Sequence, residues 1–480
     1  MERVLKVDKL NRIFEKSELG FKFSFLILCL FNFNSLTFGH KISSVFVVTT
    51  LILAGVSLLG RILNYKYYVS KTFFLLVLFL ISYVITLFLT ISYGFLTPAK
   101  TLVWLALQMF LLFLTDDRKS IAAHRRELKW LFSFYTIFMF LSSVSSIVFV
   151  FPQYSDIRYV DNIPVICGFI WGRLWGIYTD PNYAAVMAII SILISLYFLA
   201  TISKRLFKTY HILNIVAQMV YVCFSDSRTG LVALFVSLFV YTLLQVLKRG
   251  NRICKLGKVS LSVVMSLLVG TISIFAISTL KTGYNVYVSS LAQQDSTGDT
   301  ADPDTDTDIA GGNVTAPPIN IVGREDDIKN DISNRRFDLW KSGLETVMTR
   351  PLFGISFNNL VPYVQEHLPE TYLVNNDHGV FGNYHNAWID ILVGQGFVGF
   401  AIFVLLGVAL GIKSVKRLAQ QHNADEDQLY IAAFAIVVAT LVSSLFLHEL
   451  VYTLSPSTYM FWLLLGVLVS KSPGKEGERV

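Results

Sequence analysis

The sequence predicts an all-α polytopic membrane protein with about twelve transmembrane helices. Of the 480 residues, 54% are hydrophobic and only 15% are charged, whereas a soluble domain carries about 25% charged residues. The apolar residues form runs of about 20, which is the length a helix needs to cross the hydrocarbon core. Lysine and arginine gather in alternate connections between these runs, a pattern typical of a multi-pass protein.

Each apolar run can satisfy its backbone hydrogen bonds as a helix, as the lipid environment requires. The polar first 22 residues are not followed by a short apolar run with a small-residue cleavage site, so the first span is expected to be retained. The expected spans are residues 21–39, 43–62, 72–92, 98–115, 130–151, 182–202, 207–224, 229–247, 258–280, 388–412, 428–447 and 456–470.

The basic residues predict the orientation. With the N-terminus in the cytoplasm, the inward segments hold 28 of the 40 lysines and arginines, and the short outward loops hold five. The positive-inside rule then places both termini in the cytoplasm. The expected organisation is a cytoplasmic segment (1–20), nine helices (21–280), an extracytoplasmic loop (281–387), three helices (388–470) and a cytoplasmic tail (471–480).

The long outward loop contains an acidic insert at residues 293–313 (QQDSTGDTADPDTDTDIAGGN). This composition predicts disorder. The alternating aspartates do not match the spacing and glycine of an EF-hand calcium loop, so a solvated linker is the favoured interpretation. After the insert, the apolar spacing in residues 337–347 predicts a short amphipathic helix that could lie on the membrane surface.

The four cysteines show neither metal-ligand spacing nor a dense disulfide framework. A bridge between Cys167 and Cys223 would require both residues to meet within the short reach of a disulfide, so free thiols are favoured. No cluster of carboxylates and histidines predicts a metal site, and no cofactor or nucleic-acid partner is expected.

Two outward arginines lie close to the ends of predicted spans. Arg173 precedes the segment TDPN, in which Pro181 is placed as a first helical residue and Asp180 as its cap. Arg228 lies in a tight turn, SDSRTG. The alternatives are that Arg173 contacts lipid headgroups and that Arg228 forms an ion pair with Asp226.

A second group of candidates lies later in the chain. Arg335 and Arg336 occur in NRRFDLW, and His385 begins HNAWID at the start of the tenth span. The positive end of a helix dipole favours a neutral imidazole, the form that accepts a proton. An unremarkable interfacial histidine is the alternative. The glycines at 394, 396 and 399 are expected to serve close helix packing.

This combination of residues indicates binding of a phosphate group. Arginine presents planar donors that match phosphate oxygens, and the chain lacks a Gly-rich phosphate loop followed by Lys-Ser/Thr. On the outer face, a lipid-borne diphosphate that carries a sugar is the natural ligand. The arginines would hold the diphosphate and stabilise the leaving group, and the histidine would accept a proton from a sugar hydroxyl.

The motifs and their order resemble the O-antigen ligase and O-antigen polymerase superfamily of bacterial envelope proteins, over about residues 20–470. The stretches that carry the resemblance are RLWGIYTDPN (173–182), SDSRTG (225–230), RFDLWKSGLETVMTRPLFG (336–354) and HNAWIDILVGQGFVG (385–399). The resemblance implies a GT-C-like fold in the bacterial cytoplasmic (inner) membrane with an extracytoplasmic active site. It also implies metal-independent, inverting transfer from an undecaprenyl-diphosphate-linked glycan.

The resemblance implies roles for individual residues. Arg173, Arg228 and Arg336 become candidate diphosphate binders, and His385 becomes the candidate general base. Arg335 is an alternative to Arg336, which is preferred because it precedes Trp340 in the family's Arg-x-x-x-Trp pattern. The supporting candidates are Asp180, Asn182 and Asn386. Expected partners are membrane lipids, a chain-length regulator and a flippase, while the acidic insert lies outside the family pattern.

Several functions remain open at this point. A polymerase, favoured because RLWGIYTDPN is similar to capsule and exopolysaccharide polymerases, would join lipid-linked repeat units. A ligase would transfer the finished glycan to lipid A core or to protein. A transporter or flippase usually places ionisable groups near the bilayer midplane, whereas here these groups lie at the outer ends of the spans. A non-catalytic scaffold would not need outward arginines.

Overall fold

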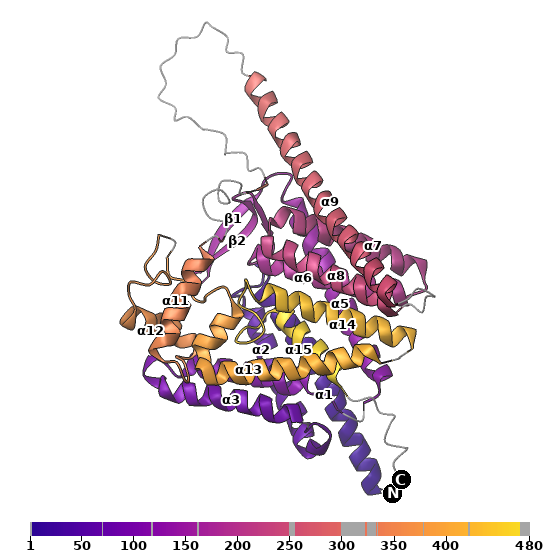
Figure 1. The fold of residues 1–480 in the computed structure, drawn as a ribbon, viewed down its shortest axis with the longest axis vertical. Helices are drawn as coiled ribbons and strands as arrows, with labels where there is room; N and C mark the ends of the chain where they lie inside the picture. Colours follow the sequence, from indigo (N-terminus) through magenta and orange to yellow (C-terminus); the bar gives the residue numbers. More distant parts are fainter. Residues whose placement is uncertain are drawn as a thin grey trace.

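The computed structural model forms an all-α membrane bundle with one small sheet (Figure 1). Within the described part of the chain, nine helices are long and apolar enough to cross a membrane. The predicted class, an all-α polytopic membrane protein, is therefore confirmed. The described residues are 2–69, 71–116, 119–160, 163–248, 255–298, 322–323, 333, 335–377, 379–420 and 423–470.

The nine helical segments with this length and composition are α2 (Lys41–Leu63), α3 (Lys71–Leu89), α4 (Leu96–Leu107) with its continuation η3 (Gln108–Phe113), α5 (Ile121–Val148), α6 (Pro181–Thr201), α8 (Arg228–Lys248), α9 (Lys255–Gly298), α13 (Ala387–Ala419) and α14 (Ala424–Ser443). The other helices are α1 (Glu2–Asn32), α7 (Arg205–Ser225), α11 (Arg336–Thr349), α12 (Leu360–His367) and α15 (Pro456–Val469), with short 3-10 turns η1 (Tyr65–Tyr67), η2 (Ile91–Tyr93) and η4 (Phe357–Asn359).

Three of the twelve predicted spans fall short of that length and composition. α1 carries Glu18 and Lys22 in its apolar half, and α15 has only 14 residues. α7 carries the buried polar side chains of His211 and Asn214. These side chains face α6, where Asn214 donates hydrogen bonds to the hydroxyls of Ser191 and Ser195, so packing and not apolar composition holds α7 in the bundle.

The connection between α5 and α6 contains three antiparallel strands in the order β1-β2-β3. They are β1 (Ser155–Val160), β2 (Ile163–Ile170) and β3 (Arg173–Gly176). Trp171 and Gly172 have positive φ and turn the chain between β2 and β3. The sheet thereby fixes Arg173 at the beginning of β3. Cys167 on β2 and Cys223 on α7 are free thiols.

Local capping fixes where α6 and α13 begin. The carboxylate of Asp180 accepts hydrogen bonds from two backbone N–H groups of the first turn of α6, and Pro181 is the first helical residue, as predicted. Asn386 caps α13 in the same way, accepting from the N–H groups of Trp388 and Ile389. The two caps therefore fix the supporting candidates Asp180 and Asn386 at the start of a helix whose first residue is buried.

α13 is interrupted at Gly396, which has φ 64° and ψ −171°. Residues 351–356 lie against the interruption, and the Phe397 N–H donates to the Pro351 carbonyl at 2.7 Å. Three more backbone hydrogen bonds link the same two segments, and they join Ile355 to Val393, Ser356 to Gly394 and Val398 to Leu352. Because a Cβ atom at Gly396 would collide with the Leu352 backbone, this glycine permits a close approach between a helix and a loop segment.

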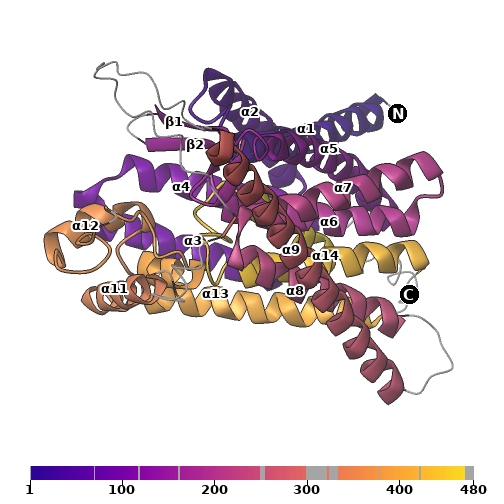
Figure 2. The ribbon, with the colours of Figure 1, turned by 90° about the horizontal axis from the view of Figure 1, so that it is seen from above.

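α11 and α12 form a lobe at the same end of the bundle as the sheet in both views (Figures 1 and 2). α11 confirms the predicted amphipathic helix, since Leu339 and Val347 are buried in the core of the lobe. On its other side, Phe337, Leu344 and Met348 are 64%, 55% and 70% exposed. An exposed apolar face of this kind suits contact with the membrane surface.

The prediction that residues 293–313 are disordered is wrong for the first part of the insert. The backbone of α9 remains helical as far as Gly298, because each added residue of an existing helix gains a backbone hydrogen bond without a new nucleation cost. Residues 299–313 lie outside the described residues. Figure 1 shows α9 projecting beyond the bundle.

We expect deletion of residues 294–312 to leave the glycan product that the resemblance implies at its wild-type amount and length. A polar, acidic insert contributes little to folding, and loops of this kind tolerate large changes in length. Gel analysis of the product, with immunoblotting of the membrane fraction, measures this. Loss of product with normal protein levels would show that the insert has a role in the reaction.

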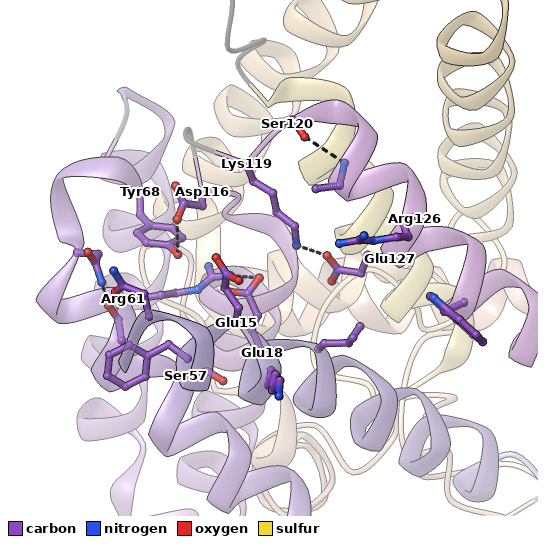
Figure 3. A pocket seen from close by; sticks show the side chains of 18 residues that line it. Glu15, Glu18, Ser57, Arg61, Tyr68, Asp116, Lys119, Ser120, Arg126 and Glu127 are labelled. Atoms are coloured by element: carbon purple, nitrogen blue, oxygen red, sulfur yellow. Dashed lines mark hydrogen bonds and ion pairs between the residues drawn. The ribbon is translucent and has the colours of Figure 1, made fainter. Parts of the chain in front are cut away.

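A buried ionic network lies at the other end of the bundle. α3 follows shortly after Tyr68, whose ring contacts Arg61 of this network, and its last residue, Leu89, accepts a hydrogen bond from Arg350 directly after α11. Its 19 residues therefore separate the two regions by about 28 Å. Lys22 contacts Glu18 at 2.9 Å and Glu127 at 2.5 Å, and Arg61 contacts Glu18 at 3.0 Å. Figure 3 shows Lys119 joined to Glu127 beside the adjoining hollow of about 530 Å³. These ion pairs fasten α1 to α2 and α5.

Candidate functional site

Arg173 is buried and is bonded to two neighbouring elements. Its Nε donates to the Ser225 carbonyl at 2.9 Å, and its Nη2 donates to Oδ1 of Asn182 at 2.8 Å. The Ser227 hydroxyl also donates to this Asn182 oxygen, at 3.0 Å. The structure thus joins the predicted residues Arg173 and Asn182, and together they hold the turn that carries Arg228.

That turn presents Arg228 at the first position of α8. Asp226 closes the turn with a left-handed φ of 46° and forms an ion pair with Lys281 of α9 at 2.8 Å. The Ser227 hydroxyl accepts a hydrogen bond from the Gly230 N–H at 3.0 Å and so caps the start of α8. These contacts fix the backbone from which the Arg228 side chain projects.

Arg228 and Arg336 line the same pocket, although they are far apart in sequence. Arg336 donates to the Thr229 hydroxyl at 3.5 Å, and its guanidinium lies 5.5 Å from the centre of the Phe446 ring. The pocket has a volume of about 230 Å³ and is lined by Arg228, Thr229, Val232, Ser333, Arg336, Phe337, Trp340 and Phe446. It therefore combines two cationic groups with an aromatic wall.

Arg335 faces a different hollow from Arg336. It precedes α11 with a left-handed φ of 64°, which turns its side chain away from that of its neighbour. Its hollow has a volume of about 360 Å³ and is lined by Arg335, Tyr372, Asn375, Asn376 and Asp377. The structure thus separates the two arginines, and Arg336 is the one that shares a pocket with Arg228.

His385 is held in a strained backbone conformation directly before α13. Its φ is 48°, a region that non-glycine residues adopt at a cost and that clusters at functional sites. Its N–H donates to Oδ1 of Asn383 at 2.9 Å, and the Tyr384 N–H donates to Oδ1 of Asp390 at 3.0 Å. With the cap supplied by Asn386, these contacts determine where the imidazole lies.

The pKa of His385 is lowered from its ordinary value. Burial is the main cause, and the positive charge of Arg336 acts in the same direction. The carboxylates of Asp180 and Asp390 oppose the shift. The direction agrees with the neutral imidazole expected from the sequence, although burial and not the helix dipole is the principal cause. His385 lies near the arginine pocket, because the Ala387 N–H donates to the carbonyls of Ser444 and Leu447, on either side of the pocket residue Phe446.

Sequence reasoning missed a second histidine beside His385. Nδ1 of His448, in the connection between α14 and α15, lies 2.8 Å from Oδ2 of Asp390. The neighbouring Glu449 is fully buried, and burial raises its pKa to about 7. The available signal was a polar pair, His448 and Glu449, within an otherwise apolar stretch of sequence.

Within the described residues, no group of three or more His, Cys, Asp and Glu side chains is arranged to hold a metal ion. Residues 213–404 match the family model described as O-antigen ligase, which supports the resemblance drawn from the motifs. The matched region contains Arg228, Arg336 and His385, whereas Arg173 and Asn182 precede it. No curated protein matches the chain.

Proposed function

Because this multi-pass membrane protein contains an O-antigen ligase family domain at residues 213–404, we propose that it is a polysaccharide polymerase. The family indicates ligase- or polymerase-type activity on lipid-linked glycans. The protein joins undecaprenyl-diphosphate-linked repeat units on the extracytoplasmic side of the bacterial cytoplasmic membrane. Arg228 and Arg336 bind the diphosphate, and His385 is the general base.

The pocket shared by Arg228 and Arg336 is the observation that carries this proposal. Two guanidinium groups match the oxygens and the charge of a diphosphate. The aromatic wall formed by Phe337, Trp340 and Phe446 offers an apolar surface to the first isoprene units of the carrier. Arg173 supports the pocket indirectly, because its bonds to Ser225 and Asn182 hold the turn before Arg228.

The proposed reaction needs only one proton transfer. The hydroxyl oxygen of the acceptor sugar forms a bond to the anomeric carbon of the donor sugar, while the bond from that carbon to the diphosphate oxygen breaks. The diphosphate leaves with the electron pair, stabilised by the arginines. The hydroxyl proton passes to the imidazole of His385.

Reconstitution with a synthetic diphosphate-lipid repeat unit tests this function, with and without a chelator. We expect chains of increasing length in both cases. Absence of any glycan transfer to lipid-linked or core acceptors would contradict the assignment, and transfer that is lost with the chelator would contradict the metal-independent reaction.

A ligase is the second candidate function, because the family model carries that description. Deleting the gene would cause different glycans to accumulate, depending on which activity the protein has. Loss of a polymerase leaves single repeat units on the acceptor, whereas loss of a ligase leaves full chains on the carrier lipid. The length of the accumulated glycan therefore decides between them.

The acid limb of the pH–rate profile should lie below pH 6.5, the ordinary pKa of histidine. A general base must be neutral, and a lowered pKa keeps the His385 imidazole neutral to a lower pH. Measuring kcat/KM from pH 4.5 to 8 in reconstituted vesicles checks this. An acid limb above pH 6.5 that disappears in the His385→Ala variant would contradict the expected direction.

A further inference from the structure

Asp390 joins the backbone before His385 to the imidazole of His448. Its Oδ1 accepts the hydrogen bond from the Tyr384 N–H at 3.0 Å, and its Oδ2 lies 2.8 Å from Nδ1 of His448. Because an ionised carboxylate only accepts hydrogen bonds, Nδ1 is the nitrogen that carries the proton. One buried carboxylate therefore uses both oxygens to connect the His385 segment to the connection between α14 and α15.

Two further contacts hold His448. The ring of Phe357 stacks on its imidazole with the centroids 4.2 Å apart and the planes 7° apart. The Tyr183 hydroxyl donates to the His448 carbonyl at 2.8 Å. The side chain of His448 is only 9% exposed, and its Nε2 is buried without a hydrogen-bond partner among the described residues. A buried ring nitrogen without a partner is costly, so His448 lowers the stability of the fold at this position.

We propose that Asp390 and His448 form a positioning pair that holds His385 in its strained backbone conformation and orients its imidazole toward the acceptor hydroxyl. This inference rests on the proposed function, since it assigns how the general base of that site is held. The pair resembles the arrangement in which a carboxylate fixes the tautomer and orientation of a histidine, but here the carboxylate also fixes the backbone of a second histidine.

The charges around His385 are consistent with this arrangement. The groups that influence its imidazole come from four elements: Asp180 before α6, Arg336 on α11, Asp390 on α13 and His448 before α15. Glu449 follows His448 and accepts hydrogen bonds from the hydroxyls of Ser443 and Ser457. Replacing Asp390 by a neutral residue removes a negative charge that raises the pKa of His385.

Two substitutions at His448 separate positioning from direct proton transfer. In His448→Asn, the amide nitrogen can occupy the place of Nδ1 and still donate to Asp390. In His448→Gln, the amide lies nearer to the place of Nε2, so the bond to Asp390 is lost. We expect His448→Asn to keep most of the wild-type kcat, and His448→Gln and Asp390→Asn to lose about 10- to 100-fold in kcat with little change in KM.

His367→Asn is the matched control, because His367 also stacks on an aromatic ring, that of Tyr363, but lies on α12. It should retain wild-type kcat. Equal, wild-type activity of all three variants of the pair would overturn the proposal. If His448→Asn and His448→Gln lose the same amount of activity at normal protein levels, and the acid limb is absent from their residual activity, His448 accepts the proton directly and the positioning role is wrong.

A second measurement does not depend on catalysis. Ring-labelled histidine gives the His385 titration by NMR in detergent, assigned by the signal that is missing from His385→Ala. We expect Asp390→Asn to lower the pKa of His385, and an unchanged titration would contradict the coupling. If the wild-type protein transferred no glycan, the proposed function would fail, whereas this titration would still decide whether the pair acts on His385.

Discussion

We expect the His385→Ala variant to lose glycan transfer by about 10²- to 10⁴-fold, which is the usual contribution of a positioned general base. The substitution removes the imidazole that we propose as the general base and leaves the proposed diphosphate pocket intact. KM for the lipid-linked donor should therefore change little. Product formation by reconstituted protein and the protein level in the membrane fraction are the measurements.

His367→Ala is the control for this variant, because His367 also lies in the lobe that contains α11 and α12 and contacts Tyr363 and Tyr93 there. It should transfer glycan at the wild-type rate. Wild-type product lengths from His385→Ala itself would remove this residue from the reaction and leave the site without its proposed base.

The Arg336→Lys variant should lose almost as much activity as Arg336→Ala, about 100-fold in kcat/KM. Lysine keeps the positive charge but lacks the planar set of donors that can bind two phosphate oxygens together. It also gives up the position that Arg336 occupies between the Thr229 hydroxyl and the Phe446 ring. Donor binding and turnover in vesicles measure both effects.

Arg335→Lys makes the same chemical change one position earlier in the chain. Since Arg335 faces the hollow lined by Tyr372 and Asn375, its replacement should leave kcat/KM close to the wild-type value. Full activity in Arg336→Lys would mean that charge alone is sufficient at this position. A severe loss in Arg335→Lys would mean that the adjacent hollow takes part in the reaction.

Local features of the fold could be predicted from the sequence because they depend on neighbouring residues. The apolar runs, the cap formed by Asp180 and Pro181, and the amphipathic helix from Arg336 to Thr349 all follow from periodicity or from short-range hydrogen bonding. The same holds for the position of His385 beside the start of α13. Each of these signals lies within one or two helical turns.

Features that depend on distant contacts could not be predicted. The strands at residues 155–176 form because β2 pairs with both neighbours, and their short, irregular sequence carries no clear alternation. Arg336 reaches Thr229 at the start of α8, and so shares a pocket with Arg228, although more than a hundred residues separate them in the sequence. His448 pairs with Asp390 only because the connection between α14 and α15 folds back over the start of α13.

The interruption of α13 at Gly396 joins the two helices that begin at proposed site residues. Four backbone hydrogen bonds link the segment after α11 to the broken turn of α13, so α11, which begins at Arg336, and α13, which begins directly after His385 and Asn386, are connected away from the pocket as well as beside it. The spacing between the proposed diphosphate binder and the proposed base therefore depends on a glycine that contacts neither of them.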